Sequence, residues 1–516
     1  MLQIGKDMKK SAYIGIIFLV GLQACSDEFL KIPPQSSVTT ANFYKTQSQF
    51  EQALIGAYAS IREAKGSIAS WVMGEMRSDN THYEYNNLNR GTALLEREDT
   101  AGFLDNNSSS YVSSKYNACY VGIARANQIL DKIEDGDFSQ QFRDRVSGES
   151  KFIRALLYFD LVRYFGGVSL HLHAVEGATQ AYLPRASVAE VYQAIESDLR
   201  DAIQKLQVAS FPQNGKATKG AAHVLLADAY LTQKKYAEAE TELKAVLAMG
   251  YSLLPDYRSV FSTTNKNSRE SIFEIQYQQG NQGQQSDFLY HFLPLSADVS
   301  RVTGIQSQNR NAGGWNVPTQ EMIDTYEPGD SRLPASIGII EGTGPVGAMV
   351  IESVVNPVGY TTPAGKRSYP FIRKYLNPHS VQNNTDDNFP VYRYSDVLLL
   401  LAESLNEQGK SAEALVHLNK VRERAGLSQS TESNQDILRD IILHERRVEF
   451  AFENKRWLDL VRTNRAITTM TEHGKYMKAL YPILRDVSYN VTPNRLLFPL
   501  PQREILIGSL EQNPGY

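Results

Sequence analysis

The sequence predicts a mainly α-helical protein with a tetratricopeptide-like helical scaffold, a long loop-rich insertion and a few short strands. Three observations support this fold class. Apolar residues recur at three- and four-residue spacing through much of the chain before position 250, which is the period of a helix with one buried face. The pattern of one pair of helical segments, at positions 225–246, recurs in the same frame at positions 400–421. Between the two copies the composition shifts toward Gln, Asn, Ser, Gly and Pro.

The N-terminal half carries six predicted helices. Most of them are separated by clusters of Pro, Gly or Asn, which favour turns. We therefore expect a helical region at residues 41–250. The apolar period runs through residues 43–63, 115–133, 142–165, 188–206, 218–232 and 237–248.

The internal repeat has the form of a helix hairpin. In each copy a small residue on the first segment precedes a small residue on the second by 12 positions, as in tetratricopeptide hairpins, where Ala lets two helices approach closely. Because the two copies are not contiguous in the sequence, an insertion must interrupt the scaffold. The matching positions are Leu225, Leu226, Ala227, Ala239, Leu243 and Val246 in the first copy, and Leu400, Leu401, Ala402, Ala414, Leu418 and Val421 in the second.

The insertion, residues 250–390, has a different pattern. Residues 272–277 alternate like a strand, residues 277–316 are rich in amide and small residues, and short Val/Ile runs follow. We expect the loops at residues 277–390 to form a ligand face, since binding residues usually lie on long loops held by a rigid frame. The C-terminal region, residues 251–516, would combine these loops with a helix hairpin at residues 395–427.

The N-terminal segment, from Met1 to Cys25, is predicted to direct the chain to a membrane. Three lysines precede a short apolar run at residues 12–20, which is typical of a secretory signal and too short to span a bilayer. The following Leu-Gln-Ala-Cys resembles a bacterial lipobox. We expect a lipoprotein signal peptide at residues 1–24, acylation of Cys25 and a lipid-anchored tether at residues 25–40. The alternative is a plain export signal with an incidental cysteine.

Composition and motifs exclude several classes of function. Lys and Arg total 53 against 57 Asp and Glu, a formal charge of −4, so no basic field would gather nucleic acid. Two cysteines cannot form a disulfide framework. His444-Glu445 lacks the second histidine of a zinc-protease helix, because position 448 is Val. We expect no metal, no cofactor and no catalytic residue.

Glu445, Glu449 and Glu453 recur at four-residue spacing, interleaved with several arginines and Asp459. Such a row could serve acid–base chemistry or form ion pairs along a helix. The ion-paired helix is favoured, because no nucleophile motif accompanies these carboxylates.

A set of short segments occurs in a specific order along the chain. The segments are residues 154–167 (RALLYFDLVRYFGG), 184–187 (PRAS), 326–332 (YEPGDSR), 392–403 (YRYSDVLLLLAE), 419–427 (NKVRERAGL), 445–447 (ERR), 456–462 (RWLDLVR), 498–501 (FPLP) and 512–516 (QNPGY). Each segment alone is weakly informative, while the ordered set is specific. From Cys25 to the last residue, the chain resembles the SusD/RagB family of lipoproteins.

The resemblance implies a surface nutrient-binding protein that works with a SusC-like TonB-dependent outer-membrane transporter. It implies an outer-membrane location, lipid-anchored and facing the cell surface, and a SusD-like helical frame with a loop-rich ligand face. The family motifs are mostly scaffold, so the residues around Trp457 are expected to fix helix packing. The ligand residues differ among members and do not transfer by motif.

Candidate ligand residues follow from the chemistry of sugars. Sugars have apolar C–H faces and many hydroxyls, so a glycan site needs exposed aromatic rings flanked by polar side chains. Residues 71–90 and 290–316 supply that mixture. Trp315 is the first choice, because Gly313 and Gly314 are expected to expose its ring; the alternative is a ring buried in the core. The candidates are Trp71, Asp79, Asn80, Tyr83, Tyr85, Tyr290, Arg310, Trp315 and Asn316.

Three functions remain open at this point. The leading hypothesis is a non-catalytic cell-surface lipoprotein that binds an oligosaccharide and delivers it to its transporter. The second replaces the glycan with peptides or glycoprotein fragments, and a remote third is a surface glycan hydrolase. Two or three aromatic contacts, each contributing about 1–2 kcal/mol, predict micromolar to millimolar affinity, which suits capture followed by release.

Overall fold

The computed structural model describes residues 43–86, 90–310, 312–345 and 349–516. The chain divides into two units, residues 1–52 and 53–516. The described part of the first unit holds an edge-to-face pair of rings, Phe43 and Tyr44, with centroids 4.8 Å apart. The predicted signal peptide, the acylated Cys25 and the tether all lie outside the described residues. Across the described ranges, no helix combines the length and apolar character needed to cross a bilayer.

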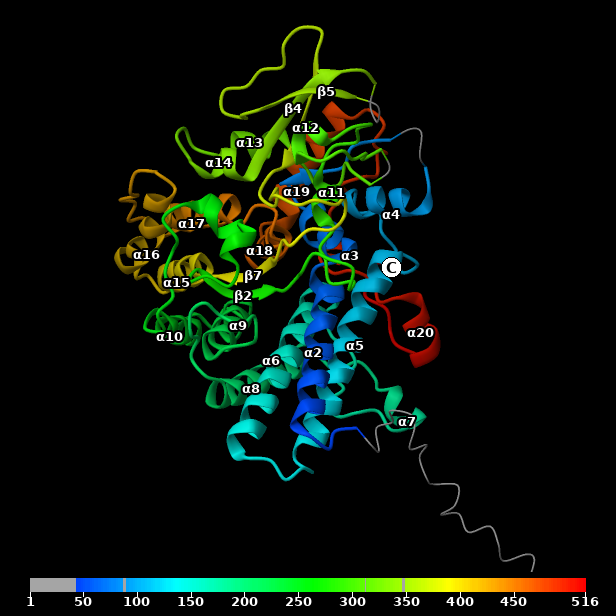
Figure 1. The fold of residues 1–516 in the computed structure, drawn as a ribbon, viewed down its shortest axis with the longest axis vertical. Helices are drawn as coiled ribbons and strands as arrows, with labels where there is room; N and C mark the ends of the chain where they lie inside the picture. The colour runs from blue at the N-terminus through cyan, green and yellow to red at the C-terminus, as the bar shows by residue number, and fades with distance from the viewer. Residues whose placement is uncertain (1–42, 87–89, 311, 346–348) are drawn as a thin grey trace, which may run out of the picture. The chain divides into compact units, whose positions relative to one another are not determined.

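Helices dominate the described chain (Figure 1). The predicted segments at residues 115–133, 142–165, 188–206, 218–232 and 237–248 correspond to α5, α6, α8, α9 and α10, so the mainly α-helical fold class is confirmed. The elements of this half are α2 (Gln47–Lys65), α3 (Ile68–Trp71), the π-helical turn η3 (Val72–Met76), β1 (Thr81–His82), α4 (Thr92–Ala101), α5 (Ser110–Ile133), α6 (Gln140–Phe165), α7 (Ala178–Ala181), α8 (Val188–Lys205), α9 (Lys219–Thr232) and α10 (Tyr236–Leu247).

Local sequence signals set several helix ends. α8 begins with a capping box, in which the Ser187 side chain accepts a hydrogen bond from the Glu190 backbone N–H and the Glu190 carboxylate accepts one from the Ser187 N–H. α6 ends at Gly166, whose φ of +75° is a conformation that glycine adopts without steric cost. These signals are local, which is why the helices could be predicted from the sequence.

The two repeated hairpins lie against each other. α9 and α10 form the first, and α15 (Tyr394–Glu407) and α16 (Ser411–Arg424) form the second. The paired alanines are fully buried, Ala227 with Ala239 and Ala402 with Ala414. α10 packs against α15, so the hairpins are neighbours in space although the insertion separates them in sequence (Figure 1).

A short β-ladder closes the insertion at its base. β2 (Ser271–Ile275) pairs antiparallel with β7 (Phe389–Arg393), with Ile275 opposite Phe389 and Ser271 opposite Arg393. The chain therefore returns to the point where it left the helical frame, which allows the second hairpin to pack on the first. The strand predicted at residues 272–277 is thus present.

Within the insertion, a three-stranded antiparallel sheet has the order β5-β4-β6. One face packs on a core that includes Leu289, Tyr290, Val299 and Phe371. The elements are η4 (Tyr257–Phe261), η5 (Thr263–Asn265), α11 (Phe288–Phe292), α12 (Ser300–Thr303), β3 (Val317–Pro318), α13 (Gln320–Asp324), α14 (Arg332–Ser336), β4 (Ile337–Thr343), β5 (Val350–Val355) and β6 (Arg367–Ile372).

The C-terminal elements complete the frame and contain a buried ionic network. They are α17 (Gln435–Glu449), α18 (Arg456–Arg462), α19 (Ala466–Leu480), η6 (Pro493–Arg495) and α20 (Gln502–Gly508). Arg332 Nη1 lies 2.6 Å from Glu445 Oε1 and 3.1 Å from Glu449 Oε2. Arg393 bonds both Glu449 and Glu453. The glutamates form ion pairs, but not along one helix as predicted: Arg332 and Arg393 come from α14 and β7, and Glu453 lies beyond the end of α17. The network is buried, so these glutamates belong to the scaffold.

Candidate functional site

A two-residue β-bridge brings the two predicted ligand windows together. β1 pairs antiparallel with β3, with Thr81 opposite Pro318 and His82 opposite Val317. Residues 71–90 and 290–316 therefore meet in space, although they are far apart in the sequence. Asn316 strengthens the junction, because its side-chain amide donates to the Trp71 carbonyl at 3.5 Å and Thr81 donates to its Oδ1 at 3.3 Å.

Next to this junction lies a hollow of about 660 Å³, here called the aromatic hollow. The volume is in the range of sites that hold small ligands. Four aromatic side chains line it: Trp71 at the end of α3, Tyr111 in the first turn of α5, Tyr277 after β2, and Trp315. Two of the nine predicted residues, Trp71 and Trp315, thus share one candidate site.

Trp71 is the most buried of the four aromatic side chains. Its side chain is 2% exposed and packs on Phe288, His291 and Phe292, with ring centroids 5.2–5.7 Å apart. Its indole Nε1 is buried without a hydrogen-bond partner among the described residues. Gln285 Oε1 and Ser67 Oγ, which belong to residues of the same wall, are also buried and unpartnered in the described structure.

The expectation of an exposed Trp315 ring is wrong, because the side chain is only 7% exposed. The two preceding glycines are needed for the backbone conformation instead. A Cβ on Gly313 would lie 2.3 Å from the Leu293 carbonyl oxygen, and Gly314 has a φ of +78°. The Arg97 guanidinium packs on the Trp315 ring, and Tyr111 meets the ring edge-on.

Tyr277 sits where the charged groups of the hollow converge. The Arg62 guanidinium lies 5.6 Å from its ring centroid, while Arg62 Nε donates to the Gln276 carbonyl at 2.8 Å. Burial raises the Tyr277 pKa well above its usual value; Asp287 and Glu63 raise it further, and Arg62 lowers it. The hydroxyl therefore stays protonated at neutral pH and can both donate and accept hydrogen bonds.

Eight of the other lining residues are polar, beside Ile68, three alanines and two glycines. Side chains of this kind, placed around aromatic rings, can exchange hydrogen bonds with a ligand rich in hydroxyls. The polar lining residues are Arg62, Glu63, Ser67, Ser110, Ser114, Gln285, Asp287 and Asn383.

Asp79 and Asn80 lie outside the hollow, in a buried polar network. Arg456 bonds both carboxylate oxygens of Asp79 at 2.8 and 2.9 Å, and Arg447 lies 3.0 Å away. Burial alone would raise the Asp79 pKa, but these two guanidinium groups outweigh it and hold the pKa well below its usual value. Asn80 donates to Glu75 and accepts from Arg447. Both side chains are engaged in holding the frame.

Tyr83, Tyr290 and Asn316 are also buried, at 4%, 0% and 1% exposed. The Tyr290 hydroxyl lies 2.8 Å from His379 Nε2, and the Tyr83 ring packs under the Arg97 guanidinium. Their polar atoms and rings are used inside the protein, which the local composition of the two windows could not reveal.

The last two candidates are accessible but separate from the hollow lining. Tyr85 is half-buried, and the Arg90 guanidinium lies 4.7 Å from its ring centroid. Arg310 is exposed. Both stay predictions.

Tyr111 and Tyr277 were not among the predicted residues. Tyr111 lies in a helix whose apolar residues are mostly core, and Tyr277 ends an alternating strand segment. Each tyrosine therefore fitted a structural role, and its pattern did not indicate ligand binding. The signal that could have identified Tyr277 is its position at the start of the amide-rich segment, where the ordered strand gives way to loop.

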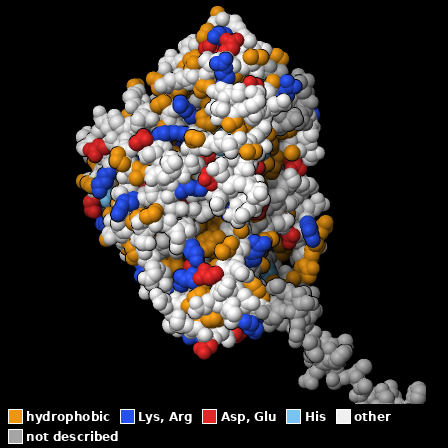
Figure 2. All heavy atoms as spheres, viewed as in Figure 1, with side chains coloured by type: hydrophobic (Ala, Val, Ile, Leu, Met, Phe, Trp, Pro, Cys, Tyr) orange, Lys and Arg blue, Asp and Glu red, His pale blue; other side chains and the backbone are white. Residues whose placement is uncertain are grey.

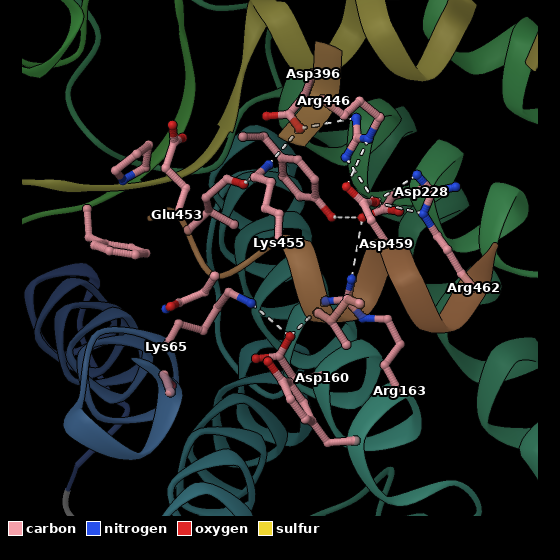
Figure 3. Close-up of a pocket in the computed structure, with 18 of the residues that line it drawn as sticks. Lys65, Asp160, Arg163, Asp228, Asp396, Arg446, Glu453, Lys455, Asp459 and Arg462 are labelled. Carbon is pink, nitrogen blue, oxygen red and sulfur yellow. Dashed lines mark hydrogen bonds and ion pairs between the residues drawn. The ribbon is translucent and has the colours of Figure 1, made fainter. Parts of the chain in front are cut away.

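A second cavity is lined by charged side chains (Figure 3). Its volume is about 60 Å³, room for roughly two water molecules. Its charged groups pair with one another: Asp160 accepts from Lys65 at 2.7 Å, Lys115 at 2.6 Å and Arg163 at 2.9 Å. Burial opposes ionisation of Asp160, but these cations dominate and depress its pKa strongly. We interpret this cavity as part of the scaffold.

Metal-binding groups and the distribution of charge also bear on the chemistry of the molecule. Among the residues placed in the structure, no group of three or more His, Cys, Asp or Glu side chains could hold a metal ion.

Figure 2 shows basic and acidic side chains interspersed over the face in view, with apolar side chains scattered between them.

Comparisons with known proteins agree with this architecture. The model of the SusD family matches residues 352–516, and a model described as starch-binding associating with outer membrane matches residues 28–231. The SusD-like protein P38 of Formosa agariphila is 28% identical over 548 residues, which cover 99% of this chain and all of that protein.

Solved structures show the same fold. A laminarin-binding SusD-like protein superposes with a TM-score of 0.72 at 26% identity, covering 92% of this chain and all of the other. A SusD superfamily protein from Bacteroides vulgatus superposes with a TM-score of 0.73 at 21% identity, with the same coverage. The interrupted helical frame is thus that of the SusD superfamily. The chain belongs to the SusD/RagB family.

Proposed function

We propose that this protein is a non-catalytic glycan-binding lipoprotein of the outer membrane, which binds an oligosaccharide in the aromatic hollow and delivers it to a SusC-like TonB-dependent transporter. The observation that carries the proposal is the hollow itself: the partly exposed ring of Tyr277 lies beside hydroxyl, amide and carboxylate groups, and the largely buried rings of Trp71, Tyr111 and Trp315 form part of the same lining. Aromatic rings pack on the C–H faces of sugars, and the polar lining residues replace the water that the hydroxyls lose.

The relatives support a glycan as the ligand. One matching family model is described as starch-binding, and one solved structure that is 26% identical is a laminarin-binding protein. Starch and laminarin are both neutral glucans, so fragments of these two polysaccharides are the first ligands to test.

Binding and catalysis can be separated in one experiment. The mature protein, a Tyr277→Ala variant and a Tyr182→Ala control would be titrated with laminarin and starch fragments by calorimetry, while released reducing sugar is measured in parallel. Tyr182 is 55% exposed and lies outside the hollow, so it controls for loss of any surface tyrosine. We expect Tyr277→Ala to weaken binding about tenfold, because one aromatic contact contributes about 1–2 kcal/mol. The control should bind normally.

Other outcomes would favour the other hypotheses. Release of reducing sugar by the wild-type protein would support a glycan hydrolase. Binding of peptides, with no binding of any glycan tested, would support delivery of peptides or glycoprotein fragments.

The membrane part of the proposal rests on the lipobox-like segment ending at Cys25. In the native host, wild-type protein should incorporate labelled palmitate, fractionate with the outer membrane, be accessible to protease added outside the cell, and co-purify with a TonB-dependent barrel. Cys25→Ser should remove the label and the membrane association while leaving glycan binding intact. A Cys25→Ser protein that still carries palmitate would contradict the assignment.

A further inference from the structure

The charged groups around the aromatic hollow indicate what kind of glycan it accepts. Three acidic or basic side chains line it: the carboxylates of Glu63 and Asp287 and the guanidinium of Arg62. Both carboxylates are exposed, and Asp287 has 57% of its side chain accessible. Asp287 Oδ2 lies 3.9 Å from His291 Nε2, which is beyond hydrogen-bond distance but close enough for an ion pair when the ring is protonated.

Arg62 is partly engaged by the protein itself. Its Nε donates to the Gln276 carbonyl, and its guanidinium packs over the Tyr277 ring. A third carboxylate adds to the negative field nearby, since Glu96 accepts hydrogen bonds from the backbone and hydroxyl of Ser110, a lining residue. Arg97, which packs on the Trp315 ring, offsets this third carboxylate, so the three carboxylates and two guanidinium groups leave a formal charge of −1.

We propose that Glu63 and Asp287 make the aromatic hollow selective for uncharged glycans and exclude those that carry uronate or sulfate groups. This inference rests on the proposed function. The two carboxylates accept hydrogen bonds from sugar hydroxyls, while an anionic group in the same place would be repelled by like charge, and among the described lining residues the guanidinium of Arg62 offsets only one of the two carboxylates.

The test uses pairs of ligands that differ in charge. Laminarin and starch fragments would be compared with the same fragments oxidised at C6, which converts primary hydroxyls to carboxylates. The proteins are the wild type, the double variant Glu63→Gln/Asp287→Asn, and a control, Glu134→Gln/Asp135→Asn, which removes the same charge from the opposite end of α5, roughly 20 Å or more from the hollow.

We expect the wild type and the control to bind the neutral form at least about tenfold more tightly than the oxidised form. The double variant should bind the neutral form with nearly unchanged affinity and reduce the difference to about threefold or less. Added salt should improve binding of the oxidised form by the wild type but not by the double variant, since screening weakens repulsion between exposed charges. Melting temperatures would establish that all three proteins are folded.

Each opposite outcome has a separate meaning. If the wild type binds both forms equally or prefers the oxidised one, the selectivity inference is overturned while glycan binding stands. If the double variant still discriminates fully, these two carboxylates are not responsible. If no form of either glycan binds, the proposed function fails together with the inference.

Discussion

The guanidinium carbon of Arg97 lies 4.6 Å from the centroid of the Trp315 ring, and both side chains are almost fully buried, at 1% and 7% exposed. No ion pair to Arg97 occurs within the described ranges; its Nη atoms lie 3.3–3.4 Å from the carbonyl oxygens of Glu84 and Gly314. Burial lowers the Arg97 pKa to about 10. The π face of Trp315 thus adds to the longer-range attraction that Glu98 and Glu84 exert on this cation.

Trp315→Ala should destabilise the protein by about 3 kcal/mol or more, because it leaves a cavity and removes the ring that covers a buried cation. Unfolding in denaturant measures this loss, with Tyr182→Ala as the exposed control. Trp315→Phe should recover part of the stability, because it keeps an aromatic face. A Trp315→Ala protein as stable as the wild type would show that the ring is not part of the core.

Gly66→Ala should weaken glycan binding several-fold by displacing Tyr277. A Cβ at position 66 would lie 2.1 Å from the Tyr277 hydroxyl oxygen, so the ring must move out of the wall of the hollow. Gly56→Ala is the matched control, since a Cβ there meets nothing within 4 Å, and an added Ala in helix α2 should stabilise slightly. Calorimetric titration with laminarin fragments measures the difference. Equal affinities for the two variants would argue against a role for Tyr277.

Glu84→Gln should increase stability more at pH 8 than at pH 5. Burial raises the Glu84 pKa to about 7, against hydrogen bonding from the Leu295 N–H and attraction by Arg97. The folded state then binds more protons than the unfolded state between about pH 4.5 and 7, so this group lowers stability as pH rises through that window. Gln removes the ionisation, and the gain should reach about 2–3 kcal/mol at pH 8. A gain independent of pH would contradict this explanation.

Arg332→Met should destabilise the protein by about 3–5 kcal/mol. It leaves Asp330, Glu445 and Glu449 buried with a missing partner, and an uncompensated buried charge costs far more than a surface ion pair contributes. The control is Arg465→Met, whose pair with Asp440 is exposed and should be worth less than about 1 kcal/mol. Denaturant unfolding of both variants decides; similar small losses would mean that the network is dispensable.

The sequence was most informative where the signal was local. The helices follow from apolar period and capping residues such as Ser187, and the repeated hairpins follow from paired alanines at one spacing. The interruption between Ala227 and Ala402 was readable as a change in composition. The pairing of β2 with β7 at the base of the insertion could not be predicted, because no local pattern shows which distant parts of the chain pair.

Site residues were predicted less well, for a physical reason. Trp71 and Trp315 do share a hollow, but Asp79 and Asn80 do not line it. Their polar atoms bond instead to Arg447 and Arg456, which lie on α17 and α18, far away in the sequence. A window dense in rings and amides is compatible with either a ligand surface or a polar core. Composition does not distinguish the two.

By itself, the sequence determined a helical frame, an interruption in it and membership of a family, since periodicity, spacing and ordered motifs are properties of the chain read in one direction. Only the tertiary structure decided which rings face a hollow and which are covered, because the exposure of a ring depends on residues that are distant in the sequence and pack against it. Tyr111 and Tyr277 illustrate this: they line one hollow only because the long insertion folds back against the start of α5.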